Sequence, residues 1–375
     1  MKLLPKMYIV ACSISYLFTC PVFSEEAESP PQTLAAQEQQ VDDAKTISQD
    51  ILSNYLQNYY QLDIVNQGHF SLRLYRQTLN KQFLNGVNAD LYRITDNLNR
   101  IAEDINTPEK IYLYSQKHLA KYKNSKDVRS QIRYDATKNT PEYFFLGPEL
   151  IGSLARLNEY GLEHVDNDAL RKILHNYDFK RFVTDKNMMK AWAAQLANQV
   201  FWLKQLGEHD YTSEFISTFR ETYPDSEDKN LTRQQYENKI YGLTHIILAD
   251  SMYYQRYVDP RNYSWIFDYF RANMSTLLLR AKADILAEIG ISFLLTNQSD
   301  DPVVSEIRQA LIKKYDPNKR LIPSSNGSDD IPFGEHRNVL AIMFLNWQQP
   351  NAAPNFQKTP EPKLTLPFGV HPKTK

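Results

Sequence analysis

A repeat of 46 residues in the second half of the chain constrains the fold more than any other feature of the sequence. Tyr177, Tyr223, Tyr269 and Tyr315 follow one another at intervals of 46 residues. The residue four positions before each tyrosine is apolar in every case. Similarity at a fixed period of this length is typical of stacked helical hairpins, because each unit buries its apolar face only against its neighbours.

Further apolar columns show how each unit is built. They lie at positions i, i+3 and i+4 of the unit, which is one face of a helix. Gly161 and Gly207 occupy the same column and indicate a turn, while Asp-Pro pairs at 259–260 and 301–302 indicate helix starts. The columns are Ile151, Ala197, Leu243 and Ile289; Leu154, Val200, Ile246 and Ser292; and Ala155, Phe201, Ile247 and Phe293.

The two helices of each unit differ in amphipathicity. Segments 191–206, 241–252 and 285–295 are apolar on most sides, whereas segments 212–221 and 303–314 have a charged side. A helix that is apolar all round is buried, so we predict inner and outer helices. Further helices are expected at 46–62, 69–83, 86–105, 109–122 and 336–347. The pattern predicts an all-α fold, a closed α/α toroid of helical hairpins, with an open α-solenoid as the alternative.

The ends of the chain differ from this body. Lys2 and Lys6 precede an apolar stretch at 7–19, which is too short to span a bilayer and is typical of a secretory signal. We predict a signal peptide at 1–24, a flexible acidic leader at 25–47, the toroid domain at 48–347 and a Pro-rich extended tail at 348–375. The expected location is periplasmic or secreted. A lipid anchor at Cys12 or Cys20 is the weaker alternative.

Composition excludes several classes of function. Both cysteines lie in the signal, so we expect no disulfide and no thiolate site. The formal net charge is −1 and no long Lys/Arg run occurs, which argues against a nucleic-acid partner. Scattered histidines predict no metal site, and the lack of a Gly-rich phosphate loop predicts no nucleotide cofactor. No second apolar stretch predicts a transmembrane segment. The sequence leaves the oligomeric state open.

Long loops point to the face that carries function. Segments 179–190, 224–235 and 316–335 lead from an outer helix into the next inner helix. Long loops over a rigid scaffold usually carry binding or catalytic groups. That face lies at the N-terminal ends of the inner helices, where the helix dipoles favour an anionic or polar ligand.

Polar residues on the inner helices are the candidate catalytic groups. Tyr241 and His245 lie at i and i+4, and such a pair suits proton abstraction next to a carboxylate; the alternative is a core histidine with a satisfied partner. Glu288 lies among apolar residues of the next inner helix, and paired carboxylates across a cleft are what glycoside hydrolysis requires. His336 opens the last inner helix.

Four other residues are candidates for substrate binding. Glu149 begins the first clear unit and Asp284 lies four residues before Glu288, although an acid at a helix start also interacts with the dipole. Arg337 suits a bidentate contact with a carboxylate, and capping is its alternative role. Trp192 suits stacking on a sugar ring, with a structural aromatic as the alternative.

The tyrosine column and the apolar inner helices of 149–347 resemble the six-hairpin α/α-toroid superfamily. The whole chain, including the segment HFSLRLYR at 69–76, also resembles an exported proteobacterial family of unknown function. The superfamily resemblance implies a fold and not an activity. Many toroid relatives are glycan hydrolases or polysaccharide lyases, and others bind or modify peptides or terpenes.

The prediction is therefore an exported helical toroid that acts on a glycan or acidic polymer as a lyase or hydrolase. The alternative is a non-catalytic periplasmic binding or protein-interaction module. In an enzyme, polar groups of the inner helices should converge at one place, whereas in a scaffold they should be scattered or paired off. The residues expected to line the cleft as catalytic groups are Tyr241, His245, Glu288 and His336.

Overall fold

The computed structural model describes residues 34–358 and 366–373. This part of the chain is mostly helical and contains one small antiparallel sheet, so the all-α class is confirmed. The signal segment 1–24, with both cysteines, lies outside the described residues. No helix of the described part is both long and apolar enough to cross a membrane.

The helices follow one another through the chain with few strands between them. The first half contains α1 (Leu34–Gln57), α2 (Ile64–Thr78), α3 (Leu84–Asp104), α4 (Pro108–Lys123), α5 (Val128–Thr137), α6 (Pro141–Glu159), α7 (Asn167–Leu174) and α8 (Phe179–Val183). The second half contains α9 (Lys186–Leu206), α10 (Thr212–Thr222), α11 (Arg233–Asp250), α12 (Ser264–Ala272), α13 (Met274–Arg280), α14 (Ala283–Leu295), α15 (Pro302–Lys314) and α16 (Ile331–Leu345). Strands β1 (Leu162–His164) and β2 (Val370–Pro372) form the sheet.

Capping side chains set the helix starts, some of them earlier than the sequence pattern predicts. α11 begins at Arg233 rather than near 241, because the side chains of Thr232 and Gln235 each accept from the other's backbone N–H in a capping box. α9 begins at Lys186 because Asp185 accepts from the Met188 N–H. The polar first turn of α11 hides its start from a search for apolar periodicity.

The predicted contrast between inner and outer helices is confirmed. Every residue of α14 except Asp284 is buried, whereas the buried residues of α10 are Phe215 and Phe219. α14 packs closely on α16, since a Cβ added at Gly290 would lie 2.2 Å from the Phe344 ring. The equivalent glycines Gly161 and Gly207 have φ of +70° and +72°, which confirms that both are turns.

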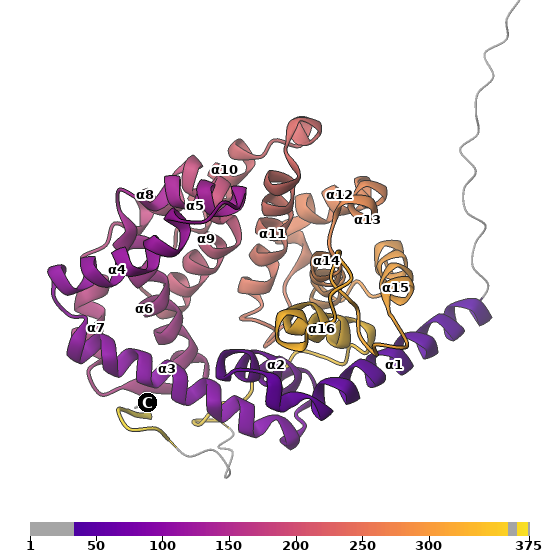
Figure 1. Ribbon diagram of the computed structural model, residues 1–375, viewed down its shortest axis with the longest axis horizontal. Coiled ribbons are helices and arrows are strands. Elements are labelled where there is room, and N and C mark those ends of the chain that lie inside the picture. Colours follow the sequence, from indigo (N-terminus) through magenta and orange to yellow (C-terminus); the bar gives the residue numbers. More distant parts are fainter. Residues whose placement is uncertain (1–33, 359–365, 374–375) are drawn as a thin grey trace, which may run out of the picture.

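The inner helices contact one another in a closed cycle. α2 contacts α3, and the contacts continue through α6, α9, α11, α14 and α16, which in turn contacts both α1 and α2. Figure 1 shows these helices around the centre of the view, with α4, α5, α8, α10, α12, α13 and α15 outside them. The end of the helical body is thus joined to its beginning. Membership of the toroid class itself stays a prediction.

The two ends of the body differ from the predicted leader and tail. The leader expected at 25–47 is helical from Leu34, and Ser48 of the same helix donates to the Ile342 carbonyl of α16. Its Ala- and Gln-rich composition favours helix once the prolines at 30–31 have passed. The tail contains no helix within 348–358 and 366–373, but it lies along the body and ends in β2, which pairs with β1.

Candidate functional site

Ionisable side chains from four inner helices meet at one place, here called the histidine cluster. α2 contributes His69, α11 contributes His245, α14 contributes Glu288, and α16 contributes Glu335 and His336. The two carboxyl groups are almost completely buried, whereas the side chains of His245 and His336 are 16% and 40% exposed. The histidines can therefore reach a ligand, and the carboxylates lie behind them.

The members of the histidine cluster form a continuous chain of contacts. Glu335 Oε1 lies 2.8 Å from His69 Nδ1, and His69 Nε2 lies 3.4 Å from His336 Nδ1. His336 Nε2 lies 3.6 Å from Glu288 Oε1. The same oxygen lies 3.8 Å from His245 Nε2. Glu288 Oε1 therefore lies between the Nε2 atoms of two histidines.

The hydrogen-bond partners assign protons along this chain. Asn198 Oδ1 is an acceptor 3.0 Å from His245 Nδ1, so His245 carries its proton on Nδ1 and has a free basic Nε2. When Glu335 is ionised, His69 donates to it from Nδ1 and accepts at Nε2, so His336 donates to His69 from Nδ1. His336 then carries a second proton on Nε2, which faces Glu288.

The electrostatic environment separates the pKa values of the three histidines. Burial lowers the pKa of His245, and burial together with nearby Arg73 lowers the pKa of His69 well below its usual value. Burial also opposes the charged form of His336, but its contact with Glu288 outweighs that cost and raises its pKa. Groups in one site whose pKa values are pushed apart are the expected acid and base of an enzyme.

The two carboxyl groups also differ. Burial opposes the ionisation of Glu288, but His245, His336 and the hydroxyl of Thr244, which donates at 2.7 Å, together lower its pKa. Burial raises the pKa of Glu335 to about 7. Glu288 is therefore a fixed negative charge near neutral pH, and Glu335 changes its protonation there.

A strained turn positions an aromatic ring against His245. Met252, Tyr253 and Tyr254, which follow α11, have φ of 53°, 53° and 71° in succession. Left-handed backbone of this kind costs L-residues roughly 1–2 kcal/mol each. The Tyr253 ring packs edge-on to the imidazole with centroids 6.4 Å apart, and its hydroxyl lies 3.4 Å from His245 Nδ1. Strained backbone of this kind is found mainly at functional sites.

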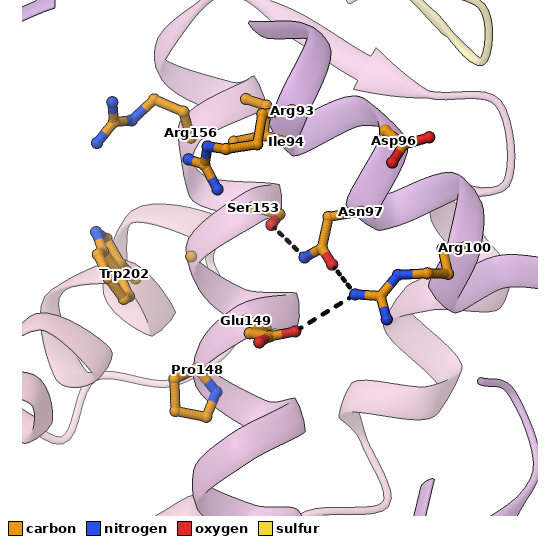
Figure 2. A pocket seen from close by; sticks show the side chains of 11 residues that line it. Arg93, Ile94, Asp96, Asn97, Arg100, Pro148, Glu149, Ser153, Arg156 and Trp202 are labelled. Atoms are coloured by element: carbon orange, nitrogen blue, oxygen red, sulfur yellow. Dashed lines mark hydrogen bonds and ion pairs between the residues drawn. The ribbon is translucent and has the colours of Figure 1, made fainter. Parts of the chain in front are cut away.

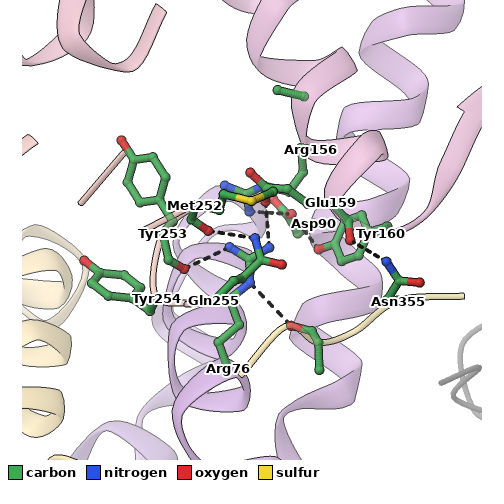
Figure 3. A network of polar contacts seen from close by, with 12 residues as sticks. Arg76, Asp90, Arg156, Glu159, Tyr160, Met252, Tyr253, Tyr254, Gln255 and Asn355 are labelled. Atoms are coloured by element: carbon green, nitrogen blue, oxygen red, sulfur yellow. Dashed lines mark hydrogen bonds and ion pairs between the residues drawn. The ribbon is translucent and has the colours of Figure 1, made fainter. Parts of the chain in front are cut away.

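Arg76 of α2 holds this turn in place (Figure 3). Its guanidinium is buried, donates to the Tyr253 carbonyl at 3.2 Å and pairs with Glu159 at 2.6 Å. Arg156 pairs with both Glu159 and Asp90. The network thus connects α2, α3 and α6 to the turn.

A cavity of about 410 Å³ lies on the inner helices α3, α6 and α9 (Figure 2). Its lining includes Arg93, Arg100 and Arg156, which carry positive charge, together with Trp202. The Trp202 ring stacks toward that of Tyr253 with centroids 6.5 Å apart. Because Tyr253 also touches His245, the cavity and the histidine cluster are neighbours.

The structure brings together most of the predicted catalytic residues. His245, Glu288 and His336 are in the histidine cluster, and Tyr241 lies beside them with its ring 6.4 Å from that of His245. Tyr241 donates to Asp284 at 2.5 Å, and burial next to that carboxylate raises its pKa well above the usual value. Tyr241 is therefore a hydrogen-bond donor and not a base.

The predicted binding residues are dispersed. Glu149 lines the cavity and accepts from the Tyr114 hydroxyl. Trp192 is buried, stacked 3.9 Å from Phe144 at a kink in α9, and so cannot stack on a sugar. Arg337 donates to the Ile322 carbonyl and holds the loop before α16 instead of facing the histidine cluster.

Four further members of the site are not indicated by the sequence pattern: His69, Glu335, Asn198 and Tyr253. Glu335 directly precedes a predicted site residue, so its position in the chain was an available clue. His69 is 267 positions from His336 and lies outside the regular repeat, so only the contact between α2 and α16 places it in the site. The site also extends beyond the helix starts, because α11 begins early and His245 lies in its second half.

The described residues contain no group of three His, Cys, Asp or Glu side chains placed to hold a metal ion. Most nitrogens of the histidine cluster are paired with carboxylates, an amide or one another, and His245 Nε2 remains available as a base.

Comparisons with known proteins give a family but no activity. Neither curated proteins nor solved structures give a match to this chain. A family model matches residues 44–373, and its description is Domain of unknown function (DUF3541). This match supports the resemblance to a family of unknown function and adds nothing to the resemblance to the toroid superfamily. The chain belongs to this DUF3541 family.

Proposed function

We propose that the protein is an exported enzyme that cleaves an acidic glycan by a lyase reaction at the histidine cluster. One observation carries the proposal: His245 and His336 face the same oxygen of Glu288, yet their pKa values are shifted in opposite directions. A neutral base and a protonated acid side by side are what a β-elimination needs.

The proposed step uses both histidines. His245 Nε2 takes the proton from the sugar carbon next to the carboxyl group, and the electrons of that C–H bond form a carbon–carbon double bond. The glycosidic C–O bond at the neighbouring carbon breaks, and His336 gives its Nε2 proton to the leaving oxygen. Glu288 stabilises the imidazolium form of either histidine. Because its oxygen lies between the two Nε2 atoms, it then passes the abstracted proton from His245 to His336.

A lyase reaction fits the carboxylates better than hydrolysis does. Glycoside hydrolysis requires two carboxyl groups that reach the sugar. The side chain of Glu288 is 1% exposed and accepts from Thr244, and Glu335 lies behind His69. The histidines are the reachable groups, and their chemistry is proton transfer.

The test is product formation by residues 25–375 on a panel of acidic and neutral polysaccharides. Ultraviolet absorbance reports the unsaturated ends made by a lyase, and a reducing-sugar assay reports hydrolysis. His245→Ala and His336→Ala should each lower the rate by roughly 10²- to 10⁴-fold, the usual contribution of a general acid or base. His175→Ala, on an exposed histidine paired with Glu208, is the matched control and should keep full activity.

Two results would contradict the proposal. Full activity of His245→Ala or His336→Ala would remove the histidines from the mechanism. Binding of a polysaccharide without any product across the panel would favour the non-catalytic binding module instead.

A further inference from the structure

The cavity between α3, α6 and α9 has the composition of a subsite for a charged sugar. Arg93, Arg100 and Arg156 line it together with the amide of Asn97. Its volume of about 410 Å³ lies within the range of small-ligand pockets, roughly 300–1,000 Å³. The carboxylates near the cavity bind only some of the N–H donors of these arginines.

Two of the arginines have donors available to a ligand. Arg93 contacts Asp90 through Nη2 at 2.9 Å, and its side chain remains 37% exposed. Arg100 is 42% exposed, donates to Asn97 and lies as far as 3.9 Å from Glu149. A guanidinium has five N–H donors, so each retains several for an incoming anion.

The two acids that line the cavity are less available. Glu149 is already bound by the hydroxyl of Tyr114 and lies next to Arg100. Figure 2 shows Asp96 pointing away from Glu149 and Trp202. An anion that enters between Arg93 and Arg100 therefore meets donors on both sides.

Trp202 forms an aromatic platform beside these arginines. Its ring lies against Gly152 of α6, where an added Cβ would be 3.2 Å from the ring, so a glycine lets the ring lie flat on the helix. The indole is partly exposed and stacks toward Tyr253, which contacts His245. Flat aromatic rings pack on the C–H face of a sugar, and this one points from the cavity toward the histidine cluster.

We propose that this cavity binds a uronic acid residue of the glycan, with its carboxylate between Arg93 and Arg100 and its ring on Trp202. The planar guanidinium fork matches the two oxygens of a carboxylate, which favours a uronate over a neutral sugar. The link between this subsite and cleavage rests on the proposed function above. Binding of a uronate in the cavity does not depend on cleavage, so the subsite and the proposed function can be disproved separately.

The experiment measures binding without turnover. Titration calorimetry measures the binding of trimers of galacturonate, glucuronate and mannuronate to the His245→Ala variant. A neutral glucose trimer and its sulfated form are the comparators. At least one uronate trimer should bind tenfold or more tightly than the neutral trimer, and added salt should weaken it. Adding Arg100→Ala or Trp202→Ala should each weaken binding at least tenfold.

Two controls keep the result specific. Arg171→Ala removes an arginine that pairs with Glu208 away from the cavity and should leave binding unchanged. Arg100→Lys keeps the charge but not the fork, and should bind less tightly than the parent and more tightly than Arg100→Ala.

The outcomes separate this proposal from the proposed function. Uronate binding that depends on Arg100 and Trp202 supports the subsite even if no polysaccharide is cleaved. Cleavage that survives Arg100→Ala and Trp202→Ala unchanged would overturn the subsite and leave the enzyme. Equal binding of neutral and uronate trimers, a preference for the sulfated trimer, or no uronate binding would each overturn it.

Discussion

Two adjacent residues of α16 both keep a proton to higher pH than usual, but for different reasons. Burial raises the pKa of Glu335 to about 7, while Glu288 raises the pKa of His336. The difference arises from their partners: Glu335 meets a neutral histidine, and His336 meets a fixed carboxylate. The protonation of each side chain thus depends on the partner that it contacts.

Glu335 should make the stability of the protein depend on pH. Its folded-state pKa of about 7 lies above the usual 4.5, so its stabilising contribution is complete below about pH 4.5 and is lost as pH rises through 7. Glu335→Gln has no such proton, so the free-energy difference between the parent and this variant should fall as pH rises, by on the order of 3 kcal/mol in total. Denaturant unfolding of both proteins across this pH range measures it, and parallel curves would contradict it.

The residue types of the site could be predicted, but their partners could not. Tyr241, His245, Glu288 and His336 were recognisable because polar residues in apolar inner helices require a reason. Nothing in the sequence shows that Trp192 lies at a kink and packs on Phe144, because a helical pattern assumes regular φ and ψ. Local periodicity gives the face of a residue and not the helix that packs against it.

At the scale of elements, two helices end in a left-handed C-cap, and only one of the two caps has the glycine that is usual there. Leu79 ends α2 with φ of 55° and is 44% exposed, whereas Gly207 ends α9 at φ of +72°. Glycine is the usual residue at such a cap because it has no Cβ to clash.

Exchanging the residue types at these two caps should have opposite effects on stability. Leu79→Gly removes the strain of a left-handed L-residue and should raise the free energy of unfolding by roughly 1 kcal/mol. Gly207→Ala introduces the same strain where nothing lies within 4 Å of a new Cβ, so it should lower stability by roughly the same amount. Thermal unfolding of both variants tests the pair, and a change of the same sign in both would refute the argument.

The elements themselves were largely predictable. The expected helices at 69–83, 86–105 and 109–122 correspond to α2, α3 and α4, with boundaries shifted by a few residues. The capping box at Thr232 and the polar turns after it show why α11 was predicted too short. Apolar periodicity detects the buried middle of a helix, and capping side chains decide its ends.

At the scale of the whole molecule, the C-terminal tail joins parts of the helical body that are distant in sequence. The Asn351 N–H donates to the Tyr254 carbonyl, and the Phe356 N–H donates to the Tyr160 carbonyl. Arg76 donates to the Ala353 carbonyl from the other side. The tail therefore supports the strained turn that positions Tyr253 on His245.

Graded truncation should separate the two parts of this tail. A chain that ends after Lys358 lacks β2 and should keep most of its activity and stability, because the contacts of Asn351 and Phe356 remain. A chain that ends after Gln349 should lose both, since the strained turn then lacks the Asn351 contact. Circular dichroism melting and the cleavage assay measure the effects, and equal behaviour of the two chains would contradict this role of the tail.

The pattern predicted a closed toroid, but it did not show which helices join the two ends of the body. The 46-residue repeat indicates stacked hairpins, but α1, α2 and α3 do not follow it. Their contacts with α16 and α6 bring His69 to Glu335 and complete the histidine cluster. Contacts between the two ends of a chain leave no local pattern.

The most direct test of the central claim is an NMR titration of the histidine side chains, assigned by single substitutions. We expect His336 to keep its second proton to higher pH than His69 and His245, and Glu288→Gln to remove this difference by lowering the pKa of His336. If the three imidazoles instead titrate together near the usual value, or if Glu288→Gln changes nothing, the acid and base roles assigned to this cluster are wrong.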